Sequence, residues 1–153
     1  MKAHLADYEQ WKASNAPSEL SLAEYIHGVF RTKAVAADAI LAIAALVWPA
    51  FIEVDGLVLL AEQYSPAKLA ELRAQGLSEG EAELWINLFC VDGFFLDLEM
   101  ASPDHEEQLA ETLVQSWEAK LAREFPGRAF HVRILRDADV GDLCVVFTRG
   151  AAP

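Results

Sequence analysis

Three carboxylates in the middle of the chain are the residues whose spacing best suits chemistry. Asp97 and Glu99 are separated by one residue, so on a strand both would point to the same face, and Asp92 lies a few residues upstream. Carboxylate oxygens of this kind bind Mg²⁺ or Mn²⁺. The segment therefore supports one hypothesis of a metal-dependent hydrolase or small-molecule binder that uses carboxylates in residues 92–99. Whether residues 94–100 form a strand or an extended connector stays open.

The residues around these carboxylates give little support to catalysis. A nuclease or phosphatase usually places a Lys or Arg where phosphate charge develops, but no basic residue occurs between Arg73 and Lys120. Neither His105 nor His131 has an adjacent Ser or Cys nucleophile, and the sequence lacks G-x-S-x-G, P-loop and G-x-G-x-x-G patterns. We therefore favour a protein without catalysis, and we expect no cofactor.

Two other polar groups have simpler structural explanations. Glu24 and His27 are one helical turn apart, as in carboxylate-bridged metal bundles, but that chemistry needs a second copy of the motif, and none exists. Asp38 precedes an apolar run and would need a partner if it were buried. The spacing of His27, Arg31 and Asp38 places all three on one face of a continuous helix, so either basic group could pair with Asp38.

The acidic charge is concentrated in one segment. The chain has 12 Lys and Arg against 24 Asp and Glu, a net charge of −12, which argues against binding to nucleic acid or to anionic membranes. Residues 53–111 hold fourteen acids against two bases, a net charge of −12, whereas residues 1–52 and 112–153 carry −1 and +1. A block of like charge steers oppositely charged partners towards it.

Aromatic residues in the same segment suggest a protein interface, because aromatic side chains often anchor such interfaces. We predict a non-catalytic binding or inhibitor-type (immunity-like) protein that presents an acidic face to a basic protein partner. The residues assigned to this face are Glu79, Glu81, Glu83, Trp85, Phe94, Phe95, Glu106 and Glu107. Two alternatives stay open. The acids could form a solvated face over core aromatics, or the chain could be a structural homodimer joined through Phe94, Phe95 or its apolar strands.

The cysteines and the N-terminus favour a cytoplasmic protein. Cys90 and Cys144 each lie among apolar neighbours and lack C-x-x-C spacing, which predicts two buried free thiols in a reducing cytosol. The N-terminus lacks the basic start and apolar stretch of a secretory signal. Ala39–Ile52 is uncharged but too short to span a membrane, so we expect a central, buried core helix there.

Local signals define the elements that position these residues. Capping boxes start helices near Ser21 and Ser78, and Asp55-Gly56 between two β-rich runs predicts a hairpin. The remaining elements are helices over 3–13, from Ser65-Pro66 to Gly76 and from Ser102-Pro103 to Pro126-Gly127, and strands over 130–135 and 143–148. The predicted fold is α+β, a single domain over residues 1–153. Four to five helices pack on a small, mostly antiparallel sheet built from two hairpins, and residues 1–17 form a peripheral helix and loop.

Overall fold

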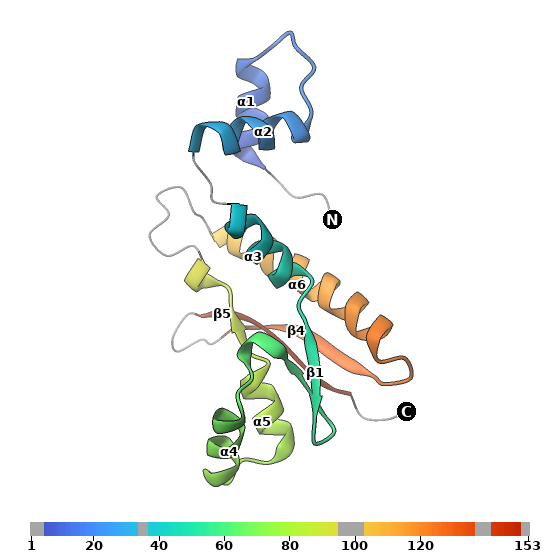
Figure 1. The fold of residues 1–153 in the computed structure, drawn as a ribbon. Coiled ribbons are helices and arrows are strands. Elements are labelled where there is room, and N and C mark those ends of the chain that lie inside the picture. The colour runs from blue at the N-terminus through green and yellow to red at the C-terminus, as the bar shows by residue number, and fades with distance from the viewer. Residues whose placement is uncertain (1–4, 34–36, 95–102, 137–141, 151–153) are drawn as a thin grey trace. The chain divides into compact units, whose positions relative to one another are not determined.

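The computed structural model describes residues 5–33, 37–94, 103–136 and 142–150. These residues form six α-helices and two small antiparallel sheets, which confirms the α+β fold (Figure 1). Contacts within the chain divide it into two compact units, residues 1–43 and 44–153. In the ranges that the structure describes, no helix is long and apolar enough to cross a membrane.

The first unit contains α1 (Ala6–Ser14), α2 (Leu22–Lys33) and the beginning of α3 (Ala37–Val47). The predicted capping box starts α2: the Glu24 carboxylate accepts from the Ser21 N–H at 2.7 Å, and the Ser21 hydroxyl accepts from the Glu24 N–H at 3.3 Å. Three aromatic rings join α1 to α2. The ring of Tyr25 lies 5.4 Å from the centroids of both Tyr8 and Trp11.

In the second unit, the end of α3 is followed by the predicted hairpin of β1 (Phe51–Val54) and β2 (Leu57–Leu60). Its turn places Asp55 at φ 53° and Gly56 at φ 80°, the left-handed conformation that a two-residue hairpin loop requires. Two short helices follow, α4 (Pro66–Ala74) and α5 (Glu79–Ile86), with side-chain caps at Ser65 and Ser78. The local signals in this part of the sequence are therefore confirmed.

The larger sheet contains β3 (Phe89–Cys90), β4 (Phe130–Arg136) and β5 (Leu143–Arg149) in the antiparallel order β3-β5-β4. The long helix α6 (Pro103–Glu124) packs against this sheet (Figure 1). The ring of Trp117 on α6 packs edge-on against Phe89 and Phe147, and its indole N–H donates to the Leu46 carbonyl at 3.0 Å.

Strand β2 contributes to two hydrophobic cores, one on each of its faces. Val58 and Leu60 pack with α6 and β5, whereas Leu57 and Leu59 pack with α4 and α5. Successive side chains of a strand point to opposite faces, so burial of all four residues means that both faces of β2 are covered. This position makes β2 the element that joins the two parts of the second unit.

The expectation of a central core helix before Pro49 is wrong. The helix forms as α3, but its side chains from Asp38 to Ala45 are exposed, and Leu41 is 68% exposed. Only Leu46 and Val47, in its last turn, pack against the core. The physical reason is that α3 crosses the boundary between the two units, so only its C-terminal end belongs to the larger one.

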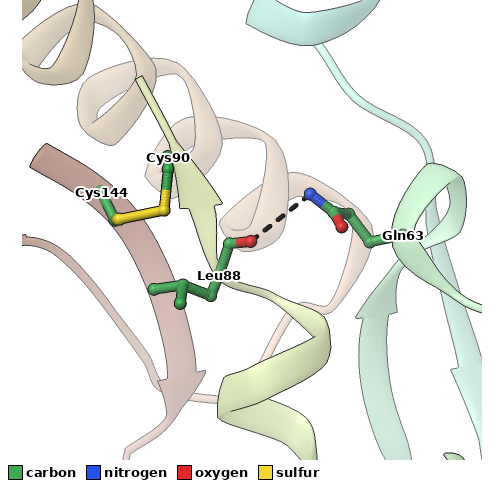
Figure 2. Close-up of a disulfide and its surroundings, with 4 residues drawn as sticks. All are labelled: Gln63, Leu88, Cys90 and Cys144. Atoms are coloured by element: carbon green, nitrogen blue, oxygen red, sulfur yellow. Dashed lines mark hydrogen bonds between the residues drawn. A yellow bond between two sulfur atoms is a disulfide. The ribbon is translucent and has the colours of Figure 1, made fainter. Parts of the chain in front are cut away.

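The prediction of two free thiols is also wrong. Cys90 and Cys144 face each other across β3 and β5 and form a disulfide, and Cys90 is exposed rather than buried (Figure 2). In the same region the Gln63 side-chain amide donates to the Leu88 carbonyl at 3.4 Å. Disulfides are rare in the cytosol, so this bond gives no support to a cytoplasmic location, which stays a prediction.

Candidate functional site

Helix α5 carries most of the predicted recognition residues that the structure describes. One side of this helix is buried through Ala82, Glu83 and Ile86. Glu79, Glu81 and Trp85 are exposed, and the Trp85 side chain is 52% exposed. Glu81 and Trp85 are four residues apart and are therefore neighbours on the helix surface. We call Glu79, Glu81 and Trp85 the α5 surface.

The two carboxylates of the α5 surface are held in place by hydrogen bonds. Glu79 accepts from Arg73 Nε at 2.9 Å and from Nη2 at 2.8 Å, and this pairing lowers the pKa of Glu79. Arg73 also donates to Asp55 at 2.9 Å. The Ser78 hydroxyl and N–H bind the Glu81 carboxylate at 2.7 and 2.8 Å and lower its pKa. Both carboxylates are therefore charged at neutral pH.

Glu83 does not belong to an exposed acidic face, and this part of the sequence prediction is wrong. Its side chain is 1% exposed. The carboxylate accepts from the Val58 N–H at 3.2 Å and pairs with Arg149 Nε at 3.1 Å. A buried carboxylate is stable only when it is paired and hydrogen-bonded, as this one is. Glu83 therefore connects α5 to β2 and β5, and it is not accessible to a partner.

Asn87, which the sequence analysis missed, has a similar role. It is fully buried, and its amide bridges the backbones of β2 and β5. The signal that could have revealed it is the spacing: Glu83 and Asn87 are four residues apart, each next to a buried apolar residue, Ala82 or Ile86. Both side chains must therefore lie on the inner face of α5.

The other predicted site residues lie on elements other than α5 or outside the described residues. Glu107 on α6 pairs with Arg136, and Glu106 is half-buried. The Phe94 side chain and the whole of Phe95 lie outside the described residues. Among the residues that the structure describes, these positions add nothing to the α5 surface.

The metal-site hypothesis gains no support from the part of the chain that the structure describes. Asp97 and Glu99 lie outside it. Asp92 lies in a short 3₁₀ helix (Asp92–Phe94) and is half-buried. Across the described ranges, no group of three or more His, Cys, Asp or Glu side chains could hold a metal ion.

The structure does not place His27, Arg31 and Asp38 on one helix. His27 and Arg31 lie on α2, Asp38 lies on α3, and all three residues are exposed. An exposed carboxylate is hydrated and does not need a partner. The sequence-based reason to expect an ion pair of Asp38 with His27 or Arg31 therefore disappears.

Basic residues from the last third of the chain neutralise part of the acidic segment. Arg128 binds Glu53 at 2.8 Å, Arg136 binds Glu107, and Arg149 binds Glu83. The imbalance in residues 53–111 is therefore smaller in three dimensions than along the sequence. Glu81 has no basic partner among the described residues. Its carboxylate is bound by the Ser78 N–H and hydroxyl instead, and it keeps its charge.

Comparison of the chain with protein-family models, curated proteins and solved structures finds no match. The fold is that of a small α+β protein. Its function must therefore be inferred from the exposed residues described above.

Proposed function

We propose that this chain is a non-catalytic binding protein of the inhibitor type, and that the α5 surface binds a basic protein partner. The observation that carries the proposal is the exposure of Trp85 one helical turn from the charged Glu81 on α5. Its side chain is 52% exposed, although α5 buries Ala82 and Ile86 on its other side. Tryptophan is among the residues most enriched at the energetic centres of protein interfaces.

The charges at the beginning of α5 support a partner of positive charge. Asp55, Glu79, Glu81 and Glu83 provide four carboxylates against the two guanidinium groups of Arg73 and Arg149. The surface is therefore negative as a whole, and the chain carries −12. Such a field increases the rate at which a basic protein associates and weakens when salt screens it.

The proposal can be tested by affinity capture from a host lysate at low and high salt. Three forms of the chain are compared: wild type, Trp85→Ser, and Trp48→Ser as the matched control. Trp48 is also a surface tryptophan, 43% exposed, and lies before β1 rather than on α5. Circular dichroism and urea midpoints establish that each variant is folded.

We expect wild type and Trp48→Ser to retain the same basic proteins at low salt and to release them at high salt. We expect Trp85→Ser to retain at least tenfold less of them, which corresponds to about 1.4 kcal/mol of binding free energy. Glu81→Gln should weaken capture mainly at low salt, and Gln can still complete the capping box. The proposal is wrong if folded Trp85→Ser captures the same proteins as wild type, or if wild type retains no basic protein at low salt.

A further inference from the structure

A pocket of about 510 Å³ opens between α1 and α2 in the first unit. Small-molecule sites generally have volumes of about 300–1,000 Å³. Asp7, Gln10, Trp11 and Ser14 line it from α1, at spacings of three and four residues that place them on one helix face. Tyr25 and Gly28 line it from α2. None of the residues that line the pocket belongs to the α5 surface, so binding in the pocket does not depend on the proposed function.

The lining combines aromatic rings with one charge. The rings of Trp11 and Tyr25 meet edge to face, with centroids 5.4 Å apart. Asp7 is the only charged residue among the described residues that line the pocket. An aromatic wall with a carboxylate favours an organic cation, because ring faces and carboxylates both attract positive charge.

The same aromatic cluster already holds one cation at its edge. The Lys12 ammonium lies 5.1 Å from the centroid of the Tyr8 ring and 3.2 Å from Glu9. Tyr8 in turn packs against Tyr25. Lys12 does not line the pocket, so its charge does not occupy the space beside Asp7.

Gly28 forms an open part of the pocket wall on α2. A Cβ atom added at Gly28 would meet no atom within 4 Å. The space in front of this residue is therefore free for a ligand, and a larger side chain at this position would extend into it.

We propose that this pocket binds a guanidinium or ammonium group with an apolar stem. The positive group would lie against Asp7, and the stem would pack on Trp11 and Tyr25. Two sources share this chemistry: the arginine side chain of a peptide and a small quaternary amine. The volume of the pocket admits either.

The test is an NMR titration of the ¹⁵N-labelled full chain with three probes. N-acetylarginine amide represents the peptide side chain, butyltrimethylammonium represents the small amine with its apolar stem, and N-acetylcitrulline amide is the uncharged isostere of the first. We expect a cation to shift the signals of Asp7, Trp11 and Tyr25, and the citrulline probe to leave them unchanged. Tighter binding of one cation than of the other identifies the source.

Two variants and one control assign the site. Asp7→Asn should weaken binding of N-acetylarginine amide at least tenfold, because the guanidinium loses a charged hydrogen-bond acceptor. Gly28→Leu should abolish binding, because the leucine side chain fills the pocket. Leucine has a higher helix propensity than glycine, so the substitution keeps α2 stable. Glu9→Gln removes a neighbouring acid of α1 that does not line the pocket, so this variant should bind like wild type.

Three outcomes would overturn the proposal: no shift with either cation, equal shifts with the arginine and citrulline probes, or wild-type affinity in Gly28→Leu. If Gly28→Leu fails to fold, the cation affinity of Asp7→Asn still tests the proposal. Wild-type affinity in that variant would show that the cation does not lie against Asp7.

Discussion

The Asn87 side-chain amide donates a hydrogen bond to the backbone carbonyl of Val58 at 2.9 Å. Its oxygen accepts from the Leu60 N–H at 2.9 Å, and its nitrogen also donates to the Phe147 carbonyl at 3.3 Å. Strand β2 pairs only with β1 among the described strands, so its other edge is buried without a partner strand. The side chains of Glu83 on α5 and of Asn87, the residue that ends this helix, satisfy that edge and connect it to β5.

Replacing Asn87 with Leu should destabilise the second unit severely. The substitution keeps the size of the side chain but leaves the buried Leu60 N–H and Val58 carbonyl without partners. Each buried orphan costs about 1–3 kcal/mol, so we expect the two to lower the free energy of unfolding by about 2–6 kcal/mol. Urea denaturation measures it, and Gln75→Leu, at an exposed amide after α4, serves as the control. A midpoint equal to that of the control would show that the bridge adds no stability.

Replacing Glu83 with Ala should also destabilise the fold, by about 2–3 kcal/mol, because it orphans the buried Val58 N–H. Arg149 is 42% exposed, so its charge remains hydrated when the carboxylate is removed. We expect Glu83→Gln to recover part of the loss, since an amide oxygen can still accept from Val58. Glu79→Ala, at an exposed ion pair, should have a much smaller effect. Comparison of the three urea midpoints checks this order.

The elements predicted correctly are those whose signals are local. The Ser78 to Glu81 capping box spans four residues, and the Asp55-Gly56 turn spans two. Both are decided by backbone groups that adjoin these side chains. Helix α3 formed for the same reason. Its burial could not be predicted, because burial depends on where a chain of two compact units divides.

The candidate site was predicted only in part, because the burial of its acids depends on residues that are far away in the sequence. Glu79, Glu81 and Glu83 are indistinguishable as neighbouring acids in the sequence. The difference between them comes from Arg149, which is 66 residues from Glu83, and from Val58, which is 25 residues away. The pairing of Cys90 with Cys144 likewise depends on the register of β3 on β5, across 54 residues. A count of charges along the chain contains none of these distances.

Leu41 on α3 and Leu113 on α6 differ in burial, so we expect their substitution to affect the free energy of unfolding differently. Leu41 is 68% exposed, whereas Leu113 on α6 is fully buried. Leu41→Lys should change the free energy of unfolding by no more than about 0.5 kcal/mol, as surface substitutions do. Leu113→Ala should cost about 2–5 kcal/mol through lost burial and a cavity. Urea midpoints of the two variants give the comparison. A large loss in Leu41→Lys would mean that α3 is buried as the sequence first suggested.

Acid should weaken α5 through Glu81. The Ser78 hydroxyl and then the Ser78 N–H lower the pKa of Glu81 below its ordinary value of 4.5. A lowered pKa in the folded state adds stability that is fully present above the ordinary value and disappears as the pH falls through the folded value. We expect the urea midpoint of wild type to fall more steeply below pH 4.5 than that of Glu81→Gln. Parallel curves for the two proteins would exclude this contribution.

Reduction should destabilise the chain through Cys90 and Cys144. The disulfide closes a loop of 54 residues, and loop-closure entropy for that length corresponds to about 4 kcal/mol. We expect a reductant to lower the urea midpoint of wild type and to leave the double variant Cys90→Ala/Cys144→Ala unchanged. These are the only cysteines in the chain, so a thiol assay on the unfolded protein is unambiguous. It should detect no thiol before reduction and both after it. Two free thiols before reduction, with a midpoint insensitive to reductant, would restore the sequence-based expectation.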